Sequence, residues 1–308
     1  MAGPGESVYT QYDRDIAARA QVWLRQEAGK HTDKPWVLFV SFVAPHYPLT
    51  APPEHFYRYF DDPKLPMPLF YGDRERPHHP FIGDYARAFN FDDYFETESD
   101  VRRAVAGYFG LCSFMDEQAG NVLGALDASG FAANTRVIYT SDHGDAVGKR
   151  GLWGKSTLYE ETVGVPLIVT GESIPQGHVV DTPANLVDVY PFIIDCVGET
   201  GSGMIEPDHP GVSIARLAVG EQPERTVLSE YHGMGSTTGA FAIRNGRFKY
   251  VHYVKYPPQL FDLENDPDEL HNLADDSAHR DKLGELKQKL REFQKRTGDP
   301  WVLKWQHE

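Results

Sequence analysis

The sequence has little cysteine and no long apolar run. Its two cysteines, Cys112 and Cys196, form no Cys-x-x-Cys pair and are too few for a disulfide framework. Both lie in apolar stretches of helical pattern, so we expect buried structural thiols. No apolar run approaches the roughly 20 residues that span a bilayer, and the start MAGPGESVYTQYDRD lacks the apolar core of a signal peptide. These absences predict no membrane partner and, if Met1 is the natural start, a cytoplasmic protein.

Positive charge is also scarce. Lys and Arg together number 30 against 45 Asp and Glu, which gives a net charge of −15 at pH 7. This balance argues against binding to a nucleic-acid backbone or to an anionic membrane surface. It does not exclude a small anionic substrate, because a metal ion and a few cations can reverse the field inside a cleft. With 41% hydrophobic residues, the 308-residue chain can build a full core without disulfides.

Alternating apolar runs and amphipathic segments predict a mostly parallel α/β core followed by a smaller α+β part. Buried strands are expected at 35–44, 135–141 and 165–171, and helices at about 98–127 and at 185–198, where Pro191 should cause a kink or break. An N-terminal helix is expected to begin after Thr10, with Asp13 completing a capping box. Residues 52–97 show no clean period and indicate a long surface excursion of the kind that forms lids or binding segments.

The pattern changes after about residue 220. Asn245-Gly246 lies between two strand-like runs and predicts a β-hairpin. Residues 277–295 predict a charged amphipathic helix on one face of an antiparallel sheet. We therefore expect two domains, residues 1–221 and 222–308.

Two of the expected strands end in polar groups. Ala44-Pro45-His46 follows the first, and Ser141-Asp142-His143-Gly144-Asp145 follows the second. Ligands of open α/β sheets gather at such strand ends. The Asp142 carboxylate and the His143 imidazole together suit one edge of a divalent-cation site. Alone, the same string also fits an Asp-Gly turn with an exposed histidine.

Three further side chains are candidates for contact with an anion. Lys155 lies in GLWGKSTLYEE beside glycines and a tryptophan, where a lysine can act as a point charge on a long stem. His46 has donors suited to an anion, and His232 in SEYHG is a weaker candidate for a pocket residue. For each of them, a solvated or backbone-satisfied side chain is the alternative.

In combination, these segments resemble the sulfatases of the alkaline-phosphatase superfamily. SDHGDAVGKRGLWGKSTLYEETVGVPLIV is similar to the family's Asp-His-Gly segment, with its following lysine and its V-P-hydrophobic strand. PWVLFVSFVAPHYPLTAPPEHF resembles the strand that ends in Pro-His-x-Pro. FAIRNGRFKYVHYVKYPPQLFDLENDPDELHNLAD resembles the family's C-terminal subdomain.

The resemblance implies an alkaline-phosphatase-like α/β fold and metal-dependent hydrolysis of a small-molecule sulfate monoester. It implies that Asp142 and His143 ligate a divalent metal, with Ca²⁺ favoured over Mg²⁺ or Mn²⁺. His46 and Lys155 would contact the sulfate. A transferring sulfuryl group spreads charge over its oxygens, and a metal, a lysine and an imidazole all stabilise such charge. Phosphate or phosphonate ester hydrolysis on the same scaffold is the alternative.

The sequence departs from the family at the nucleophile, a Cys or Ser in Cys/Ser-x-Pro-x-Arg that becomes formylglycine. Cys112 and Cys196 do not fit this motif, and Ser173-Ile-Pro175 has Gly177 where arginine should stand. The family's first strand, with paired metal-ligating aspartates, has no counterpart either. We therefore interpret the sequence as the C-terminal two-thirds of a sulfatase, for which a periplasmic location is also compatible. The chain alone is expected to be catalytically inert, or a non-catalytic anion-binding remnant. An exposed sheet edge or apolar patch should make it self-associate, as a homo-oligomer for example, or be marginally stable.

Overall fold

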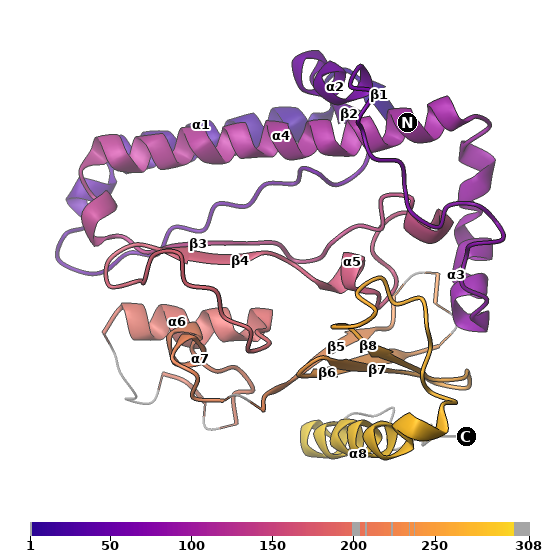
Figure 1. Cartoon of the computed structure of the whole chain (residues 1–308). Coiled ribbons are helices and arrows are strands. Elements are labelled where there is room, and N and C mark those ends of the chain that lie inside the picture. The colour runs from indigo at the N-terminus through magenta and orange to yellow at the C-terminus, as the bar shows by residue number, and fades with distance from the viewer. Residues whose placement is uncertain are drawn as a thin grey trace.

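The computed structural model describes residues 2–198, 204–206, 208–222, 224–233, 235–236 and 238–298. Long helices lie above a pair of strands, and a four-stranded sheet with a C-terminal helix lies below (Figure 1). The main helices are α1 (Val8–Gln26), α2 (Pro53–Phe60), α3 (Pro80–Phe89), α4 (Glu98–Ser129), α6 (Val189–Cys196) and α8 (Arg280–Thr297), with the short helices α5 (Glu160–Val163) and α7 (Ile214–Ala218) between them. The α/β class is confirmed.

Helices α1 and α4 form the upper layer (Figure 1). The predicted helix at 98–127 is confirmed as α4, which begins at a Thr97–Asp100 capping box and ends at Gly130 with φ 79°. The predicted cap of α1 was wrong by one turn. Ser7 is the N-cap, and Thr10 completes the box from inside the helix. Asp13 therefore takes no part in the capping box, and its side chain is fully buried.

The predicted strand at 35–44 is extended but pairs with no other strand among the residues that the structure describes. Its side chains point alternately toward the helices and toward solvent, as in a strand. Trp36 and Leu38 pack against the apolar side chains of α1 and α4, whereas Val37 and Phe39 are 62% and 87% exposed. The prediction of a buried strand was wrong because a strand needs partners for its backbone groups and cover on both faces. Val37 and Phe39 are thus exposed apolar side chains on this segment, and self-association stays a prediction.

Strand pairing is parallel between β1 (Ala2–Pro4) and β2 (Leu49–Ala51). Strands are present at the two expected places as β3 (Val137–Thr140) and β4 (Leu167–Thr170), which pair antiparallel with Tyr139 opposite Ile168. Both of these side chains are exposed. The expected burial was wrong, because every residue of both strands is half-buried or exposed. The carboxyl end of β3 carries the Asp-His-Gly segment.

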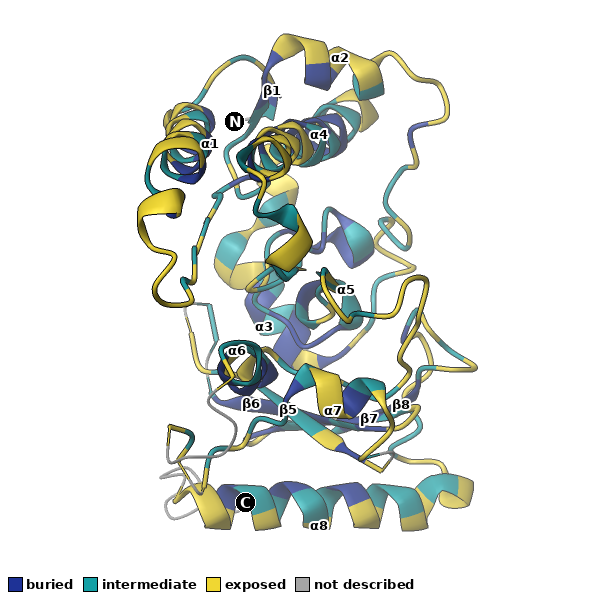
Figure 2. Cartoon of the chain, turned by 90° about the vertical axis from the view of Figure 1, so that its left-hand side faces the viewer, coloured by how far each residue is buried: buried dark blue, intermediate teal, exposed yellow. Residues whose placement is uncertain are grey.

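The C-terminal sheet has the order β5-β6-β7-β8 and is antiparallel throughout. Its strands are β5 (Thr226–Tyr231), β6 (Ala240–Asn245), β7 (Phe248–Tyr253) and β8 (Gln259–Asp262). The predicted hairpin is confirmed, with Gly246 at φ 56° in the two-residue loop. Helix α8 packs Leu286 and Leu290 against one face of this sheet and exposes its other side (Figure 2). The expected boundary at 221/222 stays a prediction.

Two other segments differ from expectation. The excursion at 52–97 contains α2 and α3, whose Phe56, Phe81 and Tyr85 are buried in the core, so this segment is structured. The helix expected at 185–198 is a 3₁₀ turn followed by α6, and Pro191 lies in the first turn of α6, where its missing N–H costs no hydrogen bond. Within the described residues, no helix is both long and apolar enough to cross a membrane.

Candidate functional site

Three of the predicted site residues meet at one point. Lys155 Nζ lies 2.8 Å from His143 Nε2 and 3.3 Å from His46 Nε2, although His46 is 109 residues away in sequence. His143 follows β3, His46 follows the extended segment at 35–44, and Lys155 returns on the loop after β3. We call these three residues the strand-end cluster. It brings three nitrogen groups together, and Lys155 contributes a full positive charge, which suits an anion.

The backbone fixes the orientation of both imidazoles. His46 Nδ1 lies 2.8 Å from the Tyr47 carbonyl oxygen, and His143 Nδ1 lies 2.8 Å from the Gly144 carbonyl oxygen. A carbonyl oxygen only accepts, so each Nδ1 carries the hydrogen and donates it. Each Nε2 is therefore the atom that faces Lys155.

Asp142 and His143 fit one edge of a divalent-cation site. The Asp142 side chain is 85% exposed, and its Oδ2 lies 3.6 Å from His143 Nε2. A histidine that donates Nδ1–H to a backbone carbonyl and leaves Nε2 open has the arrangement usual in metal-ligating histidines. Among the described residues, no group of three His, Cys, Asp or Glu side chains could surround a metal ion. Asp142 and His143 bring one oxygen and one nitrogen donor close together, and their role as metal ligands stays a prediction.

Asp145 closes the loop that carries Lys155. Its Oδ1 accepts hydrogen bonds from the backbone N–H groups of Val147, at 2.9 Å, and of Gly154, at 3.1 Å. Burial raises the pKa of the Asp145 carboxyl above its ordinary value. Gly144 allows the same loop to approach α5, because a Cβ atom there would lie 2.1 Å from the Glu161 carbonyl oxygen. No role was predicted for Asp145. The feature of the sequence that could have pointed to it is the short run of polar residues at the end of the strand.

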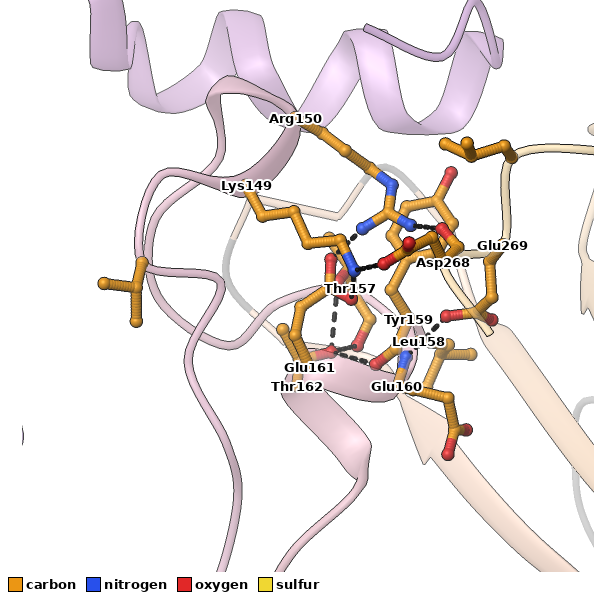
Figure 3. Close-up of polar contacts among 12 residues, drawn as sticks. Lys149, Arg150, Thr157, Leu158, Tyr159, Glu160, Glu161, Thr162, Asp268 and Glu269 are labelled. Carbon is orange, nitrogen blue, oxygen red and sulfur yellow. Dashed lines mark hydrogen bonds and ion pairs between the residues drawn. The ribbon is translucent and has the colours of Figure 1, made fainter. Parts of the chain in front are cut away.

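A buried ion network, shown in Figure 3, anchors the far side of this loop. The fully buried Arg150 pairs with Glu161 and donates to the Asp268 carbonyl oxygen, and its guanidinium lies 4.0 Å from the centre of the Tyr159 ring. Lys149 Nζ donates to Asp268 Oδ1 at 2.8 Å. Since Asp268 belongs to the C-terminal part of the chain, the network joins the site loop to that part.

Asp142, His143 and Lys155 line one part of a cavity of about 1650 Å³. Apolar side chains from β4 and β5, such as Leu167, Val169 and Leu228, contribute to its walls. His232 is placed elsewhere. It follows β5, lies 3.5 Å from Glu230, packs on the Phe241 ring and lines a separate cavity of about 570 Å³.

Neither cysteine has the environment of a nucleophile. Both are free thiols and only partly exposed. Burial raises the pKa of Cys112, beside Tyr108, to about 11, and burial also raises the pKa of Cys196. Both thiols therefore stay protonated at neutral pH, and nucleophilic attack requires the thiolate.

Comparison with known proteins gives two overlapping family matches. The family model described as Sulfatase matches residues 2–199, and the one described as N-sulphoglucosamine sulphohydrolase, C-terminal, matches residues 148–296. A choline-sulfatase of Rhizobium meliloti is 36% identical in an alignment of 274 positions, which covers 86% of this chain and 52% of the relative. An arylsulfatase K of Bos taurus is 32% identical in an alignment of 307 positions, which covers 91% of this chain and 55% of the relative. The chain thus spans about half the length of these relatives.

A solved structure supports the assignment of the fold. The phosphonate monoester hydrolase of Silicibacter pomeroyi superposes with a TM-score of 0.75 at 27% identity, covering 92% of this chain and 60% of that chain. The similarity therefore extends over most of this chain and over part of the longer hydrolase.

Proposed function

Because the chain belongs to the sulfatase family, we propose that its strand-end cluster binds the sulfate group of a sulfate monoester, as part of a site for hydrolysis of that ester. The observation that carries this proposal is the convergence of Lys155, His143 and His46 beside the Asp142 carboxylate. Chemically, an ammonium and two imidazoles at one point, with a carboxylate at the edge, suit an anion next to a metal ion.

Lys155 and His46 have separate tasks in this proposal. The Lys155 ammonium, at the end of a flexible stem, binds the oxygens of the sulfate group and stabilises the charge that grows on them. His46 adds a donor at Nε2 when its ring is protonated, because Nδ1 is already committed to the Tyr47 carbonyl. Contact of His232 with the substrate stays a prediction.

Asp142 and His143 would hold a divalent metal, with Ca²⁺ proposed first and Mg²⁺ or Mn²⁺ as alternatives. The metal, when bound, supplies Lewis-acid stabilisation of the sulfate oxygens. His143 Nε2 cannot accept a hydrogen bond from Lys155 and ligate a metal at the same time. Metal binding would therefore release the Lys155 ammonium toward the anion.

Hydrolysis also requires a nucleophile, which we propose to be a formylglycine outside these 308 residues. No Cys/Ser-x-Pro-x-Arg motif is present in the sequence. We therefore propose that the chain binds the sulfate ester but does not cleave it by itself. The compartment, cytoplasm or periplasm, remains a prediction.

The organic half of the ester would occupy the cavity of about 1650 Å³, whose apolar walls from β4 and β5 lie beyond Lys155. Similarity to a choline-sulfatase makes choline sulfate one candidate, and similarity to arylsulfatase K makes an aryl sulfate another. The structural similarity to a phosphonate monoester hydrolase favours phosphonate or phosphate monoesters as the second candidate function.

Titration with p-nitrophenyl sulfate, choline sulfate, p-nitrophenyl phosphate and a phenylphosphonate monoester tests the proposal, with Ca²⁺, Mg²⁺ or Mn²⁺ present. We expect saturable binding of the sulfate esters by calorimetry, about tenfold or more weaker in Lys155→Ala and Asp142→Ala, and no release of p-nitrophenol. Tighter binding of the phosphorus esters would support the second candidate. Turnover that both substitutions abolish would show that this chain contains a nucleophile, and the proposed division of the site would be wrong.

A further inference from the structure

We propose that Asp13 and Tyr9, one turn apart on α1, are positioning residues that hold His46 in place for contact with the anion. This inference rests on the proposed function, because it concerns how His46 reaches the sulfate group. Neither residue would touch the sulfate, and both would act through His46.

Asp13 holds the backbone that leads to His46. Its Oδ1 accepts the N–H of Val43 at 2.7 Å, and its Oδ2 accepts the N–H of Ala44 at 2.8 Å. Both carboxylate oxygens are thus committed to consecutive backbone groups, two and three residues before His46. The Asp13 side chain is fully buried, and burial raises the pKa of its carboxyl, although the two N–H bonds oppose this. A buried carboxylate is costly, so its position here points to a specific task.

The need for such an anchor follows from the segment before it. Residues 35–42 have no strand ladder among the described residues, so sheet hydrogen bonds do not fix where this segment ends. Asp13 supplies two hydrogen bonds at that end. Helix α1 is itself fixed at its start by the Ser7–Thr10 capping box and by an ion pair between Arg14 and Glu6. The anchor therefore belongs to a well-defined helix.

Tyr9 holds the ring. Its aromatic ring meets the His46 imidazole edge to face, with centroids 6.1 Å apart. Tyr47 stacks on the same imidazole with centroids 4.6 Å apart, and its carbonyl oxygen accepts the hydrogen bond from His46 Nδ1. Because residues i and i+4 share one face of a helix, Tyr9 and Asp13 reach the ring and the backbone of the same loop. Lys155 is held independently by the loop that Asp145 closes.

A double-mutant cycle tests this assignment on the full chain. Sulfate affinity is measured by NMR titration with sodium sulfate, following the imidazole and lysine side-chain signals. The variants are Asp13→Asn, Tyr9→Ala, His46→Ala and the two double variants with His46→Ala. Asp15→Asn is the matched control, because Asp15 lies on the same helix and is exposed.

We expect His46→Ala and Asp13→Asn each to weaken sulfate binding about tenfold and Tyr9→Ala about threefold. In the His46→Ala background, neither further substitution should weaken binding, because both act through His46. Asp15→Asn should bind like the unsubstituted chain. Should Asp13→Asn fail to fold, the exposed Tyr9 gives an independent cycle.

Additive losses in the double variants would overturn the inference, since they would show a general structural effect on the cluster. Unchanged affinity in both Asp13→Asn and Tyr9→Ala, with a loss in His46→Ala, would also overturn it and leave the proposed function standing. If the unsubstituted chain does not bind sulfate, or His46→Ala binds equally well, the proposed function fails at His46 and the inference fails with it.

Discussion

The Arg150→Met variant is expected to lose about 3 kcal/mol of unfolding free energy, because it leaves the largely buried carboxylate of Glu161 without its main partner. Arg150 is fully buried, and its guanidinium contacts Glu161, the Asp268 carbonyl and the face of Tyr159 (Figure 3). Lys149 Nζ lies 3.6 Å from Glu161 Oε2 and compensates only in part. Since methionine preserves most of the side-chain volume, the decrease in unfolding free energy measures the contribution of the guanidinium charge and its hydrogen bonds.

Urea unfolding followed by circular dichroism measures this effect. Arg150→Met/Glu161→Gln should recover most of the lost stability, because the double change removes both charges. Arg216→Met is the control, since Arg216 is more than half exposed and pairs with Glu221 on the surface, where less than about 1 kcal/mol is expected. A double variant as unstable as the single one would contradict this explanation.

The second large effect is expected at Asp188, where substitution by alanine should cost about 4 kcal/mol. Asp188 is fully buried, and its carboxylate accepts hydrogen bonds from both terminal nitrogens of Arg225, at 2.6 and 2.5 Å. It also accepts the backbone N–H groups of Asn185 and Val212. The alanine variant therefore leaves a buried guanidinium and two backbone donors without partners, each of which carries a desolvation cost.

The same urea experiment gives the magnitude. The matched control is Glu221→Ala, which breaks the exposed pair of Arg216 with Glu221 and should change stability by less than about 1 kcal/mol. Equal effects at Asp188 and Glu221 would mean that burial does not set the strength of these pairs, and the explanation would be wrong.

Much of the fold could be predicted from periodicity. The helix at 98–129, the strands β3 and β4, the hairpin at Gly246 and helix α8 carry clear local patterns. The pairing of the segment at 35–44 could not be predicted. Its apolar run favours an extended conformation but does not show whether a neighbouring strand is present to pair with it. The segment at 52–97 shows no clean period, since its two helices are short and several prolines lie between them.

The candidate site divides in the same way. Asp142, His143, Lys155 and His46 could be singled out because they follow strand-like runs in recognisable strings, and their convergence needed the structure. Asp13 could not be recognised as a partner of the His46 loop, since this contact joins residues 30 positions apart. One signal was available: Asp13 lies in the apolar stripe of α1 with Ala17, Ala20 and Leu24, where a carboxylate is out of place.

Under the proposed function, a divalent cation would bind at Asp142 and His143, next to a sulfate ion that Lys155 contacts. The most direct test is sulfate affinity, measured by isothermal titration calorimetry with and without calcium, at concentrations that keep calcium sulfate dissolved. Calcium should raise sulfate affinity about fivefold or more, because a bound cation would attract the sulfate oxygens and would leave the Lys155 ammonium free to contact the anion. Lys155→Ala should reduce this increase without abolishing it. Sulfate affinity that does not change with calcium, or that rises equally in Lys155→Ala, would contradict the account.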